Sequence, residues 1–89
     1  MTAKISDELL RELKRAEQTD PQQELPVIVT TAGQVNRAEL EEKGLRITHV
    51  FEFISAVSGT LTPAEAQALA QLDQVERIEF DGEVRIASA

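Results

Sequence analysis

Few side chains in this sequence could act as catalysts or metal ligands. The chain has one histidine, His49, and no cysteine. Transition-metal sites usually take several histidine or cysteine ligands, so a lone histidine is a poor basis for one. No serine motif of the nucleophile-elbow type accompanies it. We therefore interpret His49 as an ordinary strand residue, and we expect a protein that is not an enzyme and has no cofactor and no metal site.

Acidic side chains dominate the ionisable groups, with 16 aspartates and glutamates against 9 lysines and arginines and a net charge of −7. The run of Glu39, Glu41 and Glu42 has the pattern of a solvated helix face rather than of a pair of catalytic carboxylates. An acidic chain repels phosphate backbones, so we expect no nucleic-acid partner. The charge favours solubility alone, or a partner that presents positive charge or free helix N-termini.

The elements that position these groups begin with a predicted helix over residues 3–18. Ser6 is a suitable N-cap for it. Apolar residues recur at helical spacing through this segment, namely at Ile5, Leu9, Leu10, Leu13 and Ala16. We treat residues 1–20 as an amphipathic helix of their own. It could pack on the rest of the chain, join a partner or a second copy, or be loosely attached.

Residues 25–89 form the second predicted unit, which opens with a strand and a short helix. The strand is predicted over residues 25–31 from its β-branched residues. Asn36 and Glu39 have the spacing of a capping box, which marks the start of a helix. Gly44 suits the position just after the end of that helix.

The remaining elements complete a recognisable order. They are a strand over residues 45–54, a strand over residues 56–61, a helix opened by Thr62-Pro63, and a strand over residues 75–80. The resulting order β-α-β-β-α-β predicts an α+β, ferredoxin-like fold. In it, an antiparallel sheet has two helices on one face, with the N-terminal helix as an addition. The other face is open, and we expect the function there.

RNA-recognition modules share this order of elements and stack bases on aromatic side chains of the open sheet face. This chain has no tyrosine or tryptophan and only 3 phenylalanines. We expect Phe51 and Phe53 to lie on the strand face that meets the helices, so they are predicted core residues. RNA binding is therefore not expected.

Membrane association is not expected either. No apolar run approaches the roughly 20 residues needed to span a bilayer. The first residues are acidic and amphipathic, unlike a signal peptide. We expect a cytoplasmic protein.

Residues 49–81 also resemble a known family. A hydrophobic strand Val50–Ile54 is followed by the small-residue strand Ala56–Leu61, the Thr62-Pro63 helix start and the segment Val75–Asp81. This order and spacing resemble the second half of the propeptides of subtilisin-like serine proteases, and of the small free-standing inhibitors with the same fold. The resemblance covers about residues 25–89. It implies a domain that binds and inhibits such a protease and could assist its folding.

The resemblance implies that the open sheet face lies against two surface helices of the protease. The side chains suited to close approach are the row Ala56, Ser58 and Thr60 and the neighbours Thr48, Val50 and Glu52. Glu79 and Asp81 fall on family positions whose carboxylates cap the N-termini of those helices, where free N–H groups and a partial positive charge attract anions. From the residues alone, both could equally be exposed acids beside a turn.

The C-terminal tail is the second implied contact. In the family, the residues after the last strand run extended through the substrate cleft of the protease as an added strand. Here these residues are Ile86, Ala87, Ser88 and Ala89, with Ala89 at the primary specificity pocket. Gly82-Glu83 looks like an insertion relative to the usual spacing, which could shift the register. The tail could instead be a frayed end.

Two other functions stay open. The domain could be a non-inhibitory interaction module that keeps the propeptide fold and forms homo-oligomers, or binds another protein, through the N-terminal helix or a sheet edge. It could also be a regulatory domain for a small ligand, for which no residue in the sequence argues and which rests on analogy of fold alone.

Overall fold

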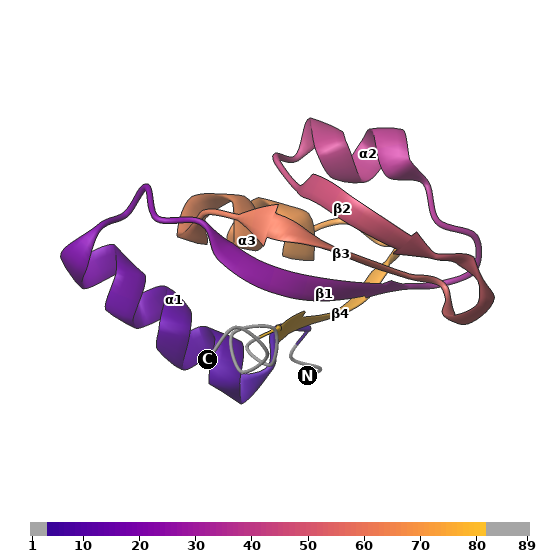
Figure 1. Ribbon diagram of the computed structural model, residues 1–89. Coiled ribbons are helices and arrows are strands. Elements are labelled where there is room, and N and C mark those ends of the chain that lie inside the picture. The colour runs from indigo at the N-terminus through magenta and orange to yellow at the C-terminus, as the bar shows by residue number, and fades with distance from the viewer. Residues whose placement is uncertain (1–3, 82–89) are drawn as a thin grey trace, which may run out of the picture.

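The computed structural model describes residues 4–81 and has the predicted order of elements (Figure 1). The elements are α1 (Asp7–Thr19), β1 (Leu25–Thr31), α2 (Arg37–Glu42), β2 (Arg46–Phe51), the 3₁₀ turn η1 (Glu52–Ile54), β3 (Ala56–Leu61), α3 (Pro63–Ala70) and β4 (Val75–Phe80). The predicted α+β, ferredoxin-like βαββαβ fold with an additional N-terminal helix is therefore confirmed.

The local signals that begin the helices behave as expected. The Ser6 hydroxyl accepts a hydrogen bond from the backbone N–H of Leu9, and the Asn36 side chain accepts one from the N–H of Glu39. Thr62 and Glu65 form a reciprocal capping box at the start of α3. These caps satisfy N–H groups that have no partner inside the helix.

The four strands form one antiparallel sheet in the order β2-β3-β1-β4. In the register, Ile28 of β1 lies opposite Ser58 of β3 and Glu79 of β4, while Val29 lies opposite Val57 and Ile78. Because side chains alternate between faces along a strand, the first set shares one face and the second set shares the other.

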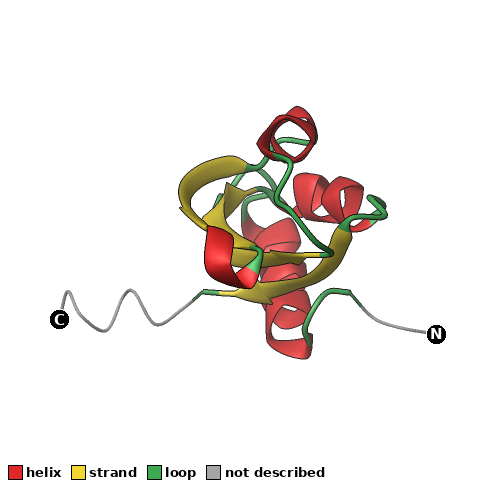
Figure 2. Ribbon diagram, turned by 90° about the vertical axis from the view of Figure 1, so that its right-hand side faces the viewer, coloured by secondary structure: helices red, strands yellow, loops and turns green. Residues whose placement is uncertain are grey.

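All three helices bury their apolar side chains against the same face of the sheet. The fully or nearly buried core residues are Ile5, Leu9, Leu13, Ala16, Leu25, Val27, Val29, Leu40, Leu45, Val57, Leu61, Ala66, Leu69, Val75 and Ile78. Figure 2 shows α2 and α3 together on one side of the strands. None of the described helices contributes a core residue to the opposite face, so we call that face the open face.

The N-terminal helix α1 belongs to this core. Leu9, Leu13 and Ala16 are buried, and α1 lies beside α3 and the β4 edge of the sheet (Figure 1). The chain just before α1 pairs with β4, because the Ser6 N–H donates to the Ile78 carbonyl at 3.0 Å. Three roles were left open for the N-terminal helix, and the structure agrees with the first, in which the helix packs on the rest of the domain. Its apolar stripe is consequently unavailable for self-association.

The prediction for the strand before η1 is wrong in its length and in the direction of its aromatic residues. β2 ends at Phe51, and its register with β3 shifts between Ile47 and His49. The extra residue, Thr48, makes a bulge that reverses the alternation of side chains beyond it. Phe51 therefore lies opposite Ala56 on the open face, and Phe53 in η1 is fully exposed.

Gly59 of β3 allows this bulge to form. A Cβ atom at Gly59 would lie 2.3 Å from the carbonyl oxygen of Arg46, so the backbone of β2 approaches β3 more closely than any side chain at this position permits. The close approach of β2 next to the bulge thus depends on which residue β3 places opposite it, and not on the β2 sequence alone.

Candidate functional site

The centre of the open face is formed by β3, which contributes short side chains, and by β1, which contributes Pro26 and Ile28. Pro26 lies opposite Thr60, and Ile28 lies opposite Ser58. The Ser58 and Thr60 side chains are partly exposed, as expected, whereas Ala56 at the end of the row is buried. Short side chains leave a low surface, which the backbone or side chains of another protein can approach closely.

Hydrogen bonds hold two of these side chains in place. The Thr60 hydroxyl donates to the Glu24 carboxylate at 2.9 Å, and the Ser58 and Thr48 hydroxyl oxygens lie 3.1 Å apart. The Thr48 hydroxyl is also within reach of the Ser58 carbonyl at 3.1 Å, and this contact ties the bulge to β3. The polar groups at the centre of the open face therefore have partners within the domain.

Glu79 and Asp81 lie at one end of the open face, where β4 ends beside the start of β1. Glu79 faces outward opposite Ile28, with its carboxylate 2.6 Å from the Arg77 guanidinium. Both side chains of this ion pair are well exposed, and such pairs add little stability. The Asp81 N–H donates to the Pro26 carbonyl at 2.9 Å, which fixes the backbone between the two carboxylates.

Val50 and Glu52 do not lie on the open face in the expected way. The expectation that Val50 faces outward is wrong, because the bulge turns it toward the helices, opposite Val57, where it packs against the core. Glu52 opens η1 and is exposed. In their place, the bulge presents His49 and Phe51 on the open face, with ring centroids 4.6 Å apart.

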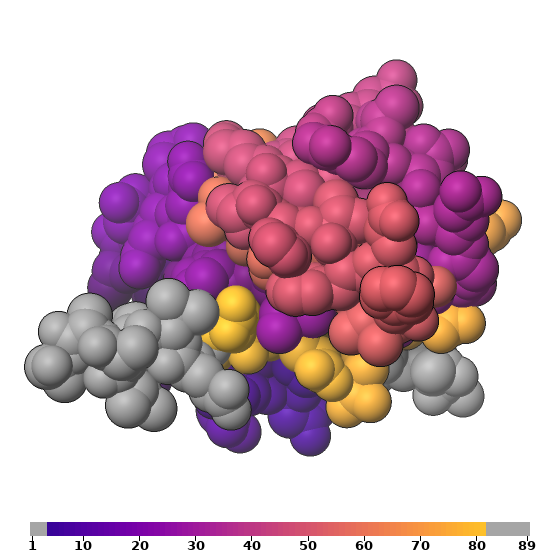
Figure 3. Space-filling view, turned by 45° about the vertical axis from the view of Figure 1, so that its right-hand side comes forward, coloured from indigo at the N-terminus to yellow at the C-terminus, as the bar shows by residue number. Residues whose placement is uncertain are grey.

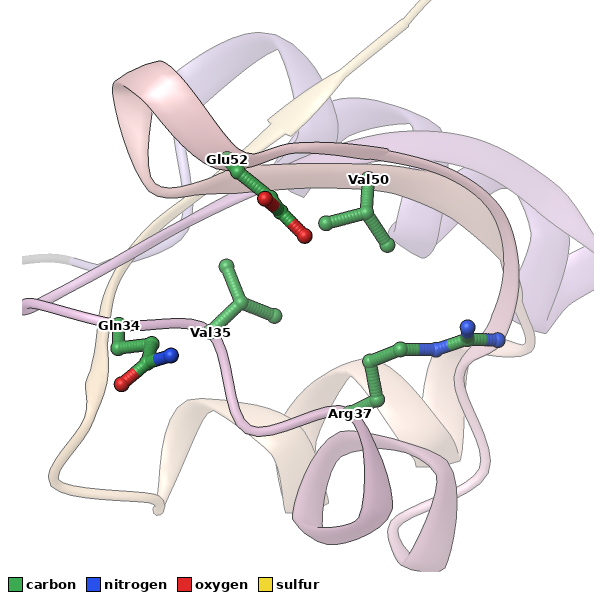
Figure 4. A pocket seen from close by; sticks show the side chains of 5 residues that line it. All are labelled: Gln34, Val35, Arg37, Val50 and Glu52. Carbon is green, nitrogen blue, oxygen red and sulfur yellow. The ribbon is translucent and has the colours of Figure 1, made fainter.

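Val50 and Glu52 instead help to line a cavity of about 430 Å³ between β2 and the chain before α2. Its other lining residues are Gln34, Val35 and Arg37. Figure 4 shows Val35 and Val50 pointing toward each other across it, with the polar side chains around them. Arg37 is paired with Glu41 at 3.4 Å, so the cavity offers no cluster of groups that could do acid–base chemistry.

Arg46 lies opposite Thr60 at the edge of the sheet and joins β2 to α3 and to the chain before β1. Its guanidinium lies 3.1 Å from the Glu65 carboxylate and 3.5 Å from that of Glu24. Burial alone raises the pKa of Glu65, but the hydrogen bond from the Thr62 N–H and the charge of Arg46 outweigh it and hold the pKa below its ordinary value. Glu65 is therefore ionised at neutral pH, and it links α3 to β2.

The predicted tail residues Ile86, Ala87, Ser88 and Ala89 lie outside the described residues. Within residues 4–81, no three histidine, aspartate or glutamate side chains lie where they could share a metal ion. In the same part of the chain, no helix is long and apolar enough to cross a membrane.

Comparison with known families decides which class of protein has this face. A family model described as peptidase inhibitor I9 matches residues 6–87. The chain belongs to the peptidase inhibitor I9 family. The resemblance found in the sequence is thereby confirmed, and the match also includes α1, which the resemblance did not. A search of curated proteins found no significant relative.

Membership of the I9 family sets the general role of the domain. I9 domains are inhibitor domains and not catalytic ones, and they act as inhibitors or propeptides of subtilisin-like proteases. The residues that sequence reasoning missed are Phe51 and Phe53, which it assigned to the core. The signal that could have found them is Gly59, because a glycine inside a strand often marks a bulge or a place where another backbone approaches closely.

Proposed function

We propose that this I9 domain binds a subtilisin-like serine protease through its open face and inhibits it reversibly by extending its C-terminal tail into the substrate cleft. The observation that supports this most strongly is the layout of the sheet. All described helices pack on one face, and the opposite face is low, partly polar and ends in Glu79 and Asp81. These carboxylates lie where the chain leaves the sheet toward the tail.

The two carboxylates suit the N-termini of helices on the protease. They are two residues apart along β4, which corresponds to roughly 7 Å in a strand, and this spacing can serve two neighbouring helices. A helix N-terminus has free N–H groups and a partial positive charge, which a carboxylate satisfies. The Glu79–Arg77 ion pair is exposed, so breaking it to bind a helix N-terminus costs little free energy.

The tail is long enough to reach a neighbouring cleft. Residues 82–89 follow Asp81, and eight extended residues span up to about 26 Å. In this proposal Ile86–Ala89 bind as an added strand, in the manner of a substrate or product. The small side chain of Ala89 and the apolar side chain of Ile86 suit a protease of broad specificity.

The packing of α1 supports inhibition by a domain that is folded before it binds. Through Leu9, Leu13 and Ala16, α1 adds a third covering helix to a core that would be small with one sheet and two helices. An inhibitor that must fold on binding loses part of its interaction energy to ordering. A domain stabilised by its own additional helix avoids that loss.

The test is a titration of the domain against a bacterial subtilisin, with hydrolysis of a chromogenic peptide as the readout. We expect competitive inhibition, and a loss of about 100-fold or more in potency when residues 86–89 are deleted. The double variant Glu79→Gln, Asp81→Asn should weaken inhibition about 10- to 100-fold while its thermal unfolding stays unchanged.

A matched control removes the same charge elsewhere. Glu17→Gln with Glu42→Gln alters two exposed acids near the C-terminal ends of α1 and α2 and should leave inhibition unchanged. Absence of inhibition by the folded wild-type domain at micromolar concentration contradicts the proposal for that protease. Unchanged potency after deletion of the tail contradicts the role of the cleft.

A further inference from the structure

The turn between β2 and β3 exposes three apolar side chains close together. Relative exposures are 39% for Phe51, 106% for Phe53 and 67% for Ile54, and these are the large apolar side chains that the described part of the chain leaves exposed. We call them the apolar tip. Exposed aromatic side chains that cluster in this way usually mark a binding surface.

The apolar tip is held in a defined conformation. Ser55, directly after it, has a positive φ of 53°, which is costly for a residue other than glycine. Its carbonyl oxygen accepts hydrogen bonds from the Thr31 N–H at 2.8 Å and from the Thr31 hydroxyl at 3.1 Å. Thr31 is buried at the end of β1, so the core itself fixes the turn. A fixed apolar group loses little entropy when it binds.

The apolar tip is continuous with the open face. Phe51 lies opposite Ala56, and His49, whose ring contacts that of Phe51, lies opposite Ser58. Figure 3 shows β2, η1 and β3 as one unbroken surface, in pink to salmon, above β4. A partner that covers the row of short side chains on β3 therefore reaches the tip as well.

The tip and the acidic residues lie at opposite ends of the sheet. Ser55 is hydrogen-bonded to Thr31 at one end of β1, whereas Asp81 is hydrogen-bonded to Pro26 near the other end. Thr31 is five residue steps from Pro26 along β1, and this corresponds to roughly 17 Å in a strand. The open face is thus bounded by carboxylates at the end where the tail begins and by apolar side chains at the far end.

The size of the open face shows why a second anchor is needed. Four strands of about six residues project an area of roughly 20 by 19 Å, or about 400 Å². A stable interface buries about 800 Å² on each partner and usually depends on a few aromatic or arginine anchors. The row Ser58–Thr60 provides no such anchor, whereas Phe51 and Phe53 at its end do.

We propose that the apolar tip is an anchor that docks onto an apolar area of the protease surface, at the far end of the open face from Glu79 and Asp81. The inference rests on the proposed function and adds a binding element to it. A second copy is the less suitable occupant. Since a whole aromatic side chain buries only about 150–250 Å², two tips meeting each other would cover far less than a stable dimer requires.

The experiment compares inhibition constants of the full-length domain and the double variant Phe53→Ala, Ile54→Ala against the same subtilisin. Both side chains are exposed, so the variant should keep its thermal unfolding midpoint. We expect inhibition about 10- to 100-fold weaker, mostly through faster dissociation. Glu17→Gln, an exposed acid on α1, is the control that keeps the apolar side chains and should inhibit like the wild type.

The outcomes separate the two proposals. If the wild type inhibits and the double variant inhibits equally well, the tip is not an anchor, while the proposed function stands. If the wild type does not inhibit, the proposed function fails and the inference fails with it. A concentration-dependent dimer of the wild type that the double variant loses in sedimentation, without a change in inhibition, would assign the tip to a second copy and overturn the inference.

Discussion

Neighbouring residues of β3 point to opposite faces of the sheet, and the two faces differ in what their side chains can do. Val57 and Leu61 are completely buried beneath the helices, whereas Ser58 and Thr60 are partly exposed on the open face. One face is aliphatic and covered by the helices. The other is partly polar, with short side chains on β3, charged side chains on β4 and the rings of His49 and Phe51 on β2. The same strands thus provide stability on one side and a surface for recognition on the other.

This separation means that substitutions should affect one property or the other according to face. Core substitutions change the free energy of unfolding by removing buried contacts and leaving cavities. Substitutions on the open face should leave that free energy nearly unchanged, because surface changes away from special features are usually within about 0.5 kcal/mol. The largest effect on stability is expected in α1, because its apolar stripe packs on the face of the sheet that the helices cover, which we call the closed face.

The largest effect is expected for Leu9→Ala. Leu9 has no exposed surface and joins α1 to the core of the sheet, so its truncation should lower the free energy of unfolding by about 2–5 kcal/mol. Urea denaturation followed by circular dichroism measures this. Lys14→Ala, on the exposed side of the same helix, is the control and should change little. A Leu9→Ala cost below about 1 kcal/mol would mean that α1 is not part of the closed face.

The next prediction compares the loss of stability from substitutions at two adjacent residues of β3 that face opposite sides of the sheet. Gly59→Ala places a Cβ 2.3 Å from the Arg46 carbonyl oxygen, so β2 must move and the domain should lose about 1–3 kcal/mol. Ser58→Ala, one residue earlier, removes only a hydroxyl from the open face and should cost less than about 1 kcal/mol. Denaturation curves of the two variants, recorded side by side, measure the difference. Equal costs would show that the close approach of β2 and β3 does not depend on Gly59.

The elements that the sequence predicted well are those with local signals. Ser6, Asn36 and Thr62 each bond an N–H group within the next few residues, so the caps form wherever the helix lies. The order of strands and helices then restricts the sheet to few arrangements. Regular alternation of side chains also holds for Ile78 and Glu79 in β4, because the irregularity in the pairing of β4 with β1 lies before them, between Val75 and Arg77.

What the sequence could not predict depends on contacts between distant segments. The bulge at Thr48 arises from the pairing of β2 with β3, and a shift of one residue moves Phe51 from one face to the other. An amphipathic stripe such as that of α1 indicates that a helix is covered, but not by which surface. The face on which a residue lies consequently agrees with the expectation where the strand is regular, at Ser58 and Glu79, and differs from it beyond the bulge, at Val50. That these residues contact a protease stays a prediction.

The smallest effect is a pH dependence of stability at the edge of the sheet, where Glu65 of α3 pairs with Arg46 of β2. The pKa of Glu65 in the folded protein lies below its ordinary value of 4.5, so ionised Glu65 stabilises the fold. Because the folded pKa is lowered, this contribution is present in full above the unfolded pKa and is lost as the pH falls through the folded pKa. Glu65→Gln removes the charge but can still accept the hydrogen bond from Thr62.

We therefore expect wild type and Glu65→Gln to differ by less than about 1 kcal/mol in unfolding free energy at neutral pH, and to converge as the pH falls through the lowered pKa of Glu65. Denaturation series at several pH values measure this difference. Glu42→Gln, an exposed acid at the end of α2, should show no such convergence. A difference that grew on acidification would mean that Arg46 does not stabilise the Glu65 carboxylate. The ionic link between α3 and β2 would then contribute nothing to the stability of the domain.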